Sequence, residues 1–316
     1  MTLRRLGNTK LMTFPLIFGG NVLGWTLDSK RSFEVLDAFF DAGGNMIDTA
    51  DVYSRWVPGN QGGESETILG QWLKQRARRD DILIATKVGM DMGPSGKGLS
   101  AAHIEQSVDA SLRRLQTDYI DLCQSHVMDP SIAQEETLAC YGKLIEKGKL
   151  RFIGASNHDV PTLRAAQRLS QQMGLPSYAT LQPHYNLCER VLFEPELAPY
   201  CLEQGLGVIP FYALASGFLT GKYRSTDDAQ QSARSRTNSK YANEKGWAIL
   251  AALDEVSQTL SSKPATVALA WLLAQKAVTA PIVSATSRTQ VDELVQAVEL
   301  HLPSEAIAIL NKASEA

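Results

Sequence analysis

Four side chains that can move a proton stand at the ends of three apolar segments in this sequence. Asp48 and Tyr53 follow the first of these segments. Lys87 comes directly after the second segment, and His126 comes two residues after the third. If the segments are neighbouring parallel strands, their carboxyl ends lie together, and the four side chains share one site. An acid, a phenol, a cation and an imidazole would then face the same space.

This set of groups suits the reduction of a carbonyl by hydride transfer. A free tyrosine has a pKa of about 10 and is a poor acid at neutral pH. We expect the Lys87 ammonium to lower the pKa of Tyr53 by stabilising its phenolate, while Asp48 holds the lysine in place and keeps it charged. Tyr53 would protonate the developing alkoxide, and His126 would orient the carbonyl as a second donor.

A different chemistry is open to the same residues. In a Schiff-base aldolase, a desolvated Lys87 with a lowered pKa would itself attack the carbonyl carbon. The nearby Asp48 weakens this alternative, because an ion-pair partner raises the pKa of a lysine. Each residue taken alone also has an ordinary structural role, and only their common position at the strand ends favours catalysis.

The elements that must position these residues alternate along the whole chain. Strands are predicted at 16–18, 45–47, 82–86, 119–124, 152–153, 178–181, 207–210 and 281–283. Helices are predicted at 31–42, 65–77, 101–115, 134–147, 160–173, 194–204, 247–260 with 266–274, and 288–298. Such alternation indicates parallel βα units, either in a closed (β/α)8 barrel or in an open doubly wound sheet. No G-x-G-x-x-G follows the first strand, so we predict an α/β protein with a single-domain (β/α)8 barrel over residues 1–316.

Composition excludes several classes of function. The 316 residues are 44% hydrophobic and 21% charged, as in an ordinary globular protein. The net charge is −3 and the sequence has no extended cluster of positive charge, so no nucleic-acid partner is expected. The 4 cysteines show no metal-ligand spacing, which predicts no metal site and a reducing, cytoplasmic location. No apolar run is long enough to span a membrane, and the oligomeric state is left open.

Four motifs in the order of the chain resemble those of the aldo-keto reductases. They are Gly44–Tyr53 (GNMIDTADVY), Asp118–His126 (DYIDLCQSH), Gly148–Asn157 (GKLRFIGASN) and Tyr212–Lys222 (YALASGFLTGK). The likeness extends from about residue 3 to residue 300 and places each motif at the end of a predicted strand. It implies an NADPH-dependent reductase of an aldehyde or ketone, with NADH use left open.

The resemblance also implies roles for individual residues. Tyr53 becomes the proton donor, tuned by Lys87 and Asp48, with His126 orienting the substrate. The implied cofactor contacts are Ser156, Asn157 and Gln182 for the carboxamide, Tyr212 for the nicotinamide ring, Leu214, Ser216, Gly217 and Lys222 for the pyrophosphate, and Ser284, Thr286, Arg288, Gln290 and Glu293 for the adenosine end. The substrate pocket is expected to be lined by Trp25, Trp56 and His126, and further out by His184, Tyr185 and Tyr223.

Three points stay open at this level. Arg288 is the one full cation in the segment 284–293, and it either pairs with a 2′-phosphate or is an ordinary surface residue at a helix start. The polar stretch 217–246 is expected to be a long, mostly unstructured loop near the cofactor. Some relatives with the same residues are cofactor-sensing β subunits of potassium channels, so a regulatory subunit on the same fold is the alternative function.

Overall fold

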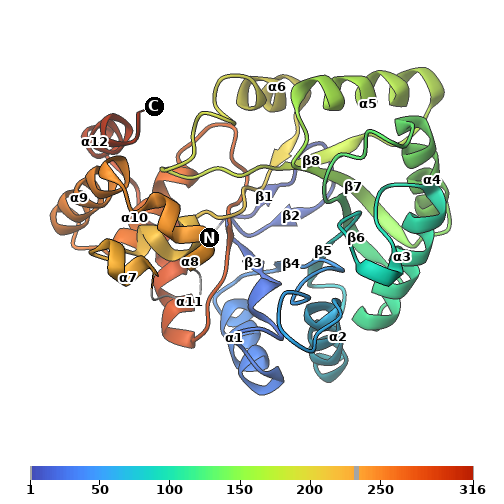
Figure 1. Ribbon diagram of the computed structural model, residues 1–316, viewed down its shortest axis with the longest axis horizontal. Coiled ribbons are helices and arrows are strands. Elements are labelled where there is room, and N and C mark those ends of the chain that lie inside the picture. Colours follow the sequence, from blue (N-terminus) through green and yellow to red (C-terminus); the bar gives the residue numbers. More distant parts are fainter. Residues whose placement is uncertain (1, 231–234, 316) are drawn as a thin grey trace.

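Eight parallel strands make up the central sheet of the computed structural model, which describes residues 2–230 and 235–315. The strands are β3 (Ile17–Gly19), β4 (Met46–Asp48), β5 (Leu83–Val88), β6 (Ile120–Ser125), β7 (Leu150–Ser156), β8 (Tyr178–Gln182), β9 (Gly207–Val208) and β10 (Ile282–Val283). Their order is β10-β3-β4-β5-β6-β7-β8-β9, and the helices surround them (Figure 1). All eight predicted strands are therefore present, with ends shifted by up to three residues.

The ring closes between β9 and β10 through a few main-chain contacts. Val208 forms an isolated parallel bridge with Val278, and its carbonyl accepts a hydrogen bond from the N–H of Thr279 at 2.8 Å. Further along the two strands, the N–H of Ile282 donates to the carbonyl of Pro210 at 2.9 Å. We call this junction the seam. With it, the sheet is the predicted (β/α)8 barrel.

The predicted helices are also present, and local signals explain several of their ends. They are α1 (Ser29–Asp41), α2 (Glu64–Arg76), α3 (Ala101–Leu115), α4 (Gln134–Glu146), α5 (Val160–Met173), α6 (Leu197–Gln204), α9 (Glu244–Thr259), α10 (Pro264–Leu273) and α11 (Arg288–Val295). The hydroxyl of Ser100 caps α3 by accepting from the N–H of His103, and Pro264 occupies the first turn of α10. No helix in the described part of the chain is both long and apolar enough to cross a membrane.

Three features differ from the sequence-based expectation. The hairpin of β1 (Arg4–Arg5) and β2 (Met12–Thr13) and the C-terminal α12 (Ser304–Ser314) were not predicted. The stretch 217–246 is not simply unstructured, although residues 231–234 lie outside the described part. Its short helices are η3 (Ala215–Thr220), which overlaps its start, α7 (Thr226–Gln230), α8 (Ser235–Asn238), η4 (Ser239–Tyr241) and the first turn of α9. Helices of three to six residues show no periodicity and depend on tertiary packing, so the sequence does not reveal them.

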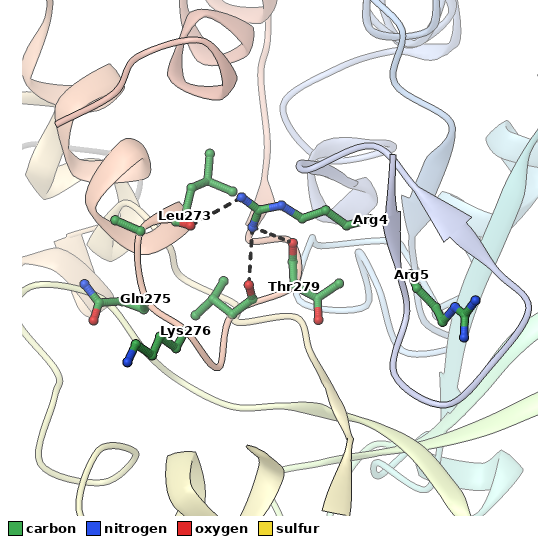
Figure 2. A pocket seen from close by; sticks show the side chains of 8 residues that line it. Arg4, Arg5, Leu273, Gln275, Lys276 and Thr279 are labelled. Atoms are coloured by element: carbon green, nitrogen blue, oxygen red, sulfur yellow. Dashed lines mark hydrogen bonds between the residues drawn. The ribbon is translucent and has the colours of Figure 1, made fainter. Parts of the chain in front are cut away.

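The hairpin closes the amino-terminal end of the barrel. Leu6 and Leu11, between its two strands, are buried in the cluster that fills the barrel interior. The guanidinium of Arg4 donates to the carbonyls of Leu273, Val278 and Thr279 at 3.2–3.4 Å (Figure 2). A surface cavity of about 340 Å³ lies beside this contact, at the opposite end of the strands from the four polar residues. Access to those residues is therefore from the carboxyl end of the sheet.

Candidate active site

The barrel brings the four predicted polar residues together. Asp48 is the last residue of β4, Lys87 lies near the end of β5, and His126 comes one residue after β6. The Nζ of Lys87 is 2.6 Å from Oδ2 of Asp48 and 2.8 Å from the hydroxyl of Tyr53. The rings of Tyr53 and His126 meet edge to face with centroids 6.2 Å apart. Adjacent parallel strands thus create this cluster, as their order in the sequence predicts.

Lys87 is fully enclosed and has a partner for each of its three N–H donors. Besides Asp48 and Tyr53, its Nζ donates to the carbonyl of Thr49 at 2.8 Å. Its side chain has 0% exposure. Burial lowers the pKa of Lys87, and the negative charge of Asp48 opposes that change. The three acceptors match the geometry of an ammonium ion.

Asp48 is surrounded by hydrogen-bond donors. Its Oδ1 accepts from Nε2 of Gln124 at 3.1 Å and from Nε2 of Gln182 at 2.8 Å, while Oδ2 faces Lys87. Sequence reasoning missed the role of Gln124. A signal was present, because a strand alternates its faces and Gln124 lies two residues before His126, on the same inward side.

The pKa of Tyr53 moves opposite to our expectation. Burial and the neighbouring Asp48 raise it well above its ordinary value, whereas we had expected Lys87 to lower it. Burial is the main cause, and the Asp48 carboxylate, 3.5 Å from the hydroxyl, adds to it by disfavouring a second negative charge there. Tyr53 is therefore protonated throughout the physiological pH range. The contact with Lys87 becomes important only when the proton leaves.

His126 is a neutral imidazole in this setting. Burial and the positive charge of Lys87 lower its pKa well below the ordinary value. Its Nδ1 is buried, and no described residue gives it a hydrogen-bond partner. The backbone carbonyl of His126 accepts from Nδ2 of Asn157 at 3.0 Å, which links it to the next strand end. A neutral ring can donate one hydrogen bond without competing with Lys87 for negative charge.

Trp56, expected on the substrate side, lies beside Tyr53, and Trp25 lies beside Trp56. Trp25 and Trp56 pack edge to face with centroids 5.7 Å apart, and Trp56 lies 6.0 Å from the Tyr53 ring. Trp56 remains 48% exposed. The expectation for Tyr185 is wrong, since its ring is buried against Trp271 and its hydroxyl donates to Oε1 of the partly exposed Glu194 at 2.7 Å. Apolar rings therefore line the approach to the phenol on this side.

The residues expected at the carboxamide meet at the ends of β7 and β8. The hydroxyl of Ser156 donates to the carbonyl of Gln182 at 3.0 Å, and Nδ2 of Asn157 lies 3.1 Å from the same hydroxyl. Nε2 of Gln182 is engaged by Asp48, whereas no described residue donates to its Oε1. This donor and acceptor set is complementary to a primary amide.

The segment after β9 is a tight turn with several left-handed residues. Tyr212, Ala215, Ser216 and Gly217 all have positive φ, and the N–H groups of Ala215 and Gly217 donate to the carbonyls of Tyr212 and Leu214 at 2.7 and 2.8 Å. The ring of Tyr212 is 43% exposed, and Leu214 is partly buried. The ammonium of Lys222 lies close to Gly217, where an added Cβ would stand 3.4 Å from Nζ. An exposed aromatic side chain and a nearby ammonium are groups suited to a nicotinamide ring and an anionic pyrophosphate.

The residues expected at the adenosine end follow β10. The hydroxyl of Ser284 bonds to the carbonyl of Gly19, and Oε1 of Gln290 accepts from Thr286 at 2.8 and 3.1 Å. Glu293 is occupied by an ion pair with Lys263. Arg288 begins α11 and is exposed, with no ion pair among the described residues. Of this group, Arg288 is therefore available to an anion at a helix N-terminus.

The chain resembles known proteins over almost its whole length. The model of the aldo/keto reductase family matches residues 15–315. The chain belongs to the aldo/keto reductase family. It is 34% identical to the uncharacterized oxidoreductase YrpG of Bacillus subtilis, over 97% of this chain and 94% of that protein. It is 30% identical to a norsolorinic acid reductase of Aspergillus flavus, over 90% and 72% of the two chains.

A third relative has a different kind of name. A probable voltage-gated potassium channel subunit beta of Arabidopsis thaliana is 32% identical over 99% of this chain and 95% of its own length. The family accordingly includes proteins named as reductases and proteins named as channel subunits. Membership supports an oxidoreductase that acts on small molecules with a nicotinamide cofactor, and the choice of cofactor and substrate rests on the site itself.

Proposed function

We propose that this chain reduces an aldehyde or ketone to an alcohol with NADPH, using Tyr53 as the proton donor. The observation that carries the proposal is the position of the Lys87 ammonium, 2.8 Å from the Tyr53 hydroxyl and 2.6 Å from the Asp48 carboxylate. A phenol bonded to a buried, fixed cation is an acid whose conjugate base has its counter-ion already in place. The substrate is a small carbonyl compound, and the location is the cytoplasm.

The cofactor would lie along the carboxyl ends of β7 to β10. When bound, its nicotinamide supplies the hydride. Tyr212 would carry the ring, and Arg288 would pair with the 2′-phosphate that distinguishes NADPH from NADH. The remaining contacts would come from Ser156, Asn157, Gln182, Leu214, Ser216, Gly217, Lys222, Ser284, Thr286, Gln290 and Glu293. Binding of NADH, without the Arg288 contact, would be weaker.

Two protein groups would contact the carbonyl oxygen, and a third would stabilise the charge that the reaction leaves behind. The neutral imidazole of His126 and the hydroxyl of Tyr53 would both donate to that oxygen and so fix its direction. As negative charge develops there, Tyr53 would transfer its proton, and the Lys87 ammonium would stabilise the phenolate that remains. Asp48, held by two glutamine amides, keeps Lys87 in place. Trp25 and Trp56 would shield the reacting centre from water.

The geometry disfavours one of the two alternatives, and turnover separates the other. A Schiff-base lysine needs a free lone pair, whereas Lys87 donates to three oxygens and has no exposure. A regulatory subunit needs the cofactor but no turnover. Steady oxidation of NADPH with a panel of aldehydes separates it from an enzyme. Tight NADPH binding without any turnover would leave the regulatory role.

Substitution of Tyr53 by Phe tests the proton donor. We expect kcat to fall by about 10²–10⁴, the usual contribution of a general acid, while NADPH still binds. Turnover is measured by the loss of NADPH absorbance, and binding by fluorescence titration. Tyr119→Phe is the matched control, because that tyrosine lies at the other end of β6 and should leave kcat unchanged. Full activity of Tyr53→Phe would refute the assignment.

A further inference from the structure

Tyr212 has a conformation that its own side chain does not favour. Its φ is +53°, in the left-handed region that a bulky aromatic residue rarely adopts. The residue as a whole is 43% exposed, so burial holds the backbone there only in part. Contacts to the rest of the residue must therefore stabilise this conformation.

The side chain of Asn186 supplies such a contact. Its Nδ2 donates to the carbonyl oxygen of Tyr212 at 2.9 Å, and Asn186 has 0% exposure. The same carbonyl accepts from the N–H of Ala215 at 2.7 Å, so Asn186 provides the link from outside the segment. A buried amide donor at this distance is costly to leave without its acceptor.

Asn186 is itself held rigidly by the loop after β8. Its Oδ1 accepts from the N–H of Cys188 at 2.8 Å, and its backbone exchanges hydrogen bonds with Glu189 at 3.0 and 3.4 Å. In the same loop, the ring of His184 contacts the edge of Tyr212 with centroids 5.3 Å apart. The amide therefore joins a fixed loop to the backbone of an exposed aromatic residue.

We propose that Asn186 is the positioning residue that holds Tyr212 as the stacking surface for the nicotinamide ring. The proposal rests on the role given to Tyr212 in the proposed function. It places the determinant of ring geometry in the loop after β8, whereas Tyr212 follows β9. Loss of the Nδ2 donor lets the backbone of Tyr212 leave the left-handed region and moves the ring away from the phenol of Tyr53. The adenosine end of the cofactor site, which follows β10, stays unchanged.

The test compares two ligands that share the adenosine end. NADPH contains the nicotinamide, and 2′,5′-ADP does not. We expect Asn186→Asp, which keeps the acceptor for Cys188 but loses the donor to Tyr212, to weaken NADPH about tenfold, equivalent to about 1.4 kcal/mol. Binding of 2′,5′-ADP should be unchanged. Asn186→Ala, which adds no charge, should give the same selective loss and serves if the aspartate variant does not fold.

Two further variants separate the possible outcomes. Glu189→Gln changes the same loop without touching Tyr212 and should bind both ligands normally. Tyr212→Ala should weaken NADPH selectively. If it does so while the Asn186 variants do not, the positioning role is wrong and the proposed function stands. Equal weakening of both ligands by the Asn186 variants would also overturn the inference. If Tyr212→Ala has no selective effect, the assignment of Tyr212 in the proposed function fails and the inference fails with it.

Discussion

Replacement of Asp48 by Asn should expose the cost of an uncompensated lysine in the barrel. Each atom that faces the carboxylate is a donor, from Lys87 on one side and from Gln124 and Gln182 on the other. An isosteric amide removes the counter-charge and points its N–H2 group at one of these donors. Removing one partner of a buried ion pair costs about 3–5 kcal/mol, so we expect the free energy of unfolding to fall by that amount at neutral pH.

The pH dependence of this loss follows from the remaining lysine. Without Asp48, burial dominates, and the pKa of Lys87 falls further below its ordinary value. The unfolded chain then binds more protons than the folded chain up to about pH 10, so stability rises with pH in this range. If Lys87 is neutral in the folded variant, the deficit should shrink by about 1.4 kcal/mol per pH unit. The amide introduced at position 48 faces donors with its own N–H2 group, and this mismatch contributes a part of the deficit that does not depend on pH.

Urea denaturation followed by tryptophan fluorescence, at about pH 7 and about pH 9, measures this deficit. Asp109→Asn is the control, because that carboxylate forms an ion pair with Lys149 that is partly exposed, and should cost about 1 kcal/mol or less. Adding Lys87→Met to Asp48→Asn should restore part of the stability, since both charges are then gone. A deficit that stays constant with pH, together with additive effects in the double variant, would refute the reasoning.

Two other predictions concern charges elsewhere in the site region. Arg288→Ala should raise KM for NADPH more than KM for NADH, because only NADPH carries the 2′-phosphate; equal changes in steady-state assays would mean that Arg288 does not contact it. Asp51 is buried, and burial together with Glu66 raises its pKa to about 8 against the opposing charges of Arg114 and Lys87. Because the unfolded carboxyl ionises at about pH 4, the free energy of unfolding should fall as the pH rises from about 4 to about 8. Asp51→Asn should reduce that fall in urea titrations at about pH 5 and about pH 8, and parallel curves for the two proteins would contradict the assignment.

The strands and the polar cluster were predictable because their signals are local. Apolar segments bounded by polar residues indicate the strands, and parallel topology places the residues after them at one end. Asp48, Tyr53, Lys87 and His126 therefore meet as expected. The hairpin at Arg4–Thr13 was missed because its strands are two residues long and carry no periodicity. The C-terminal α12 is explained by its contact with α9, which only the folded chain contains.

Properties that depend on several elements could not be predicted. The pKa of Tyr53 results from burial and a carboxylate 3.5 Å away, and neither distance nor burial can be read from residue types. The contact of Asn186 with Tyr212 joins residues 26 positions apart through a backbone conformation that the sequence does not reveal. The ion pair of Glu293 with Lys263, 30 residues earlier, likewise could not be read from the sequence.

The seam gives the proposed cofactor site a second significance. Tyr212 follows β9 and Ser284 follows β10, so the two ends of a dinucleotide would be attached on opposite sides of the junction where the ring is held by few main-chain bonds. A molecule bound across that junction contacts both of its sides, so its binding free energy opposes local opening of the barrel. Proteases cleave a chain in its opened state. The ratio of loaded to empty protein would therefore govern how long each molecule survives in the cell, in addition to how fast it works.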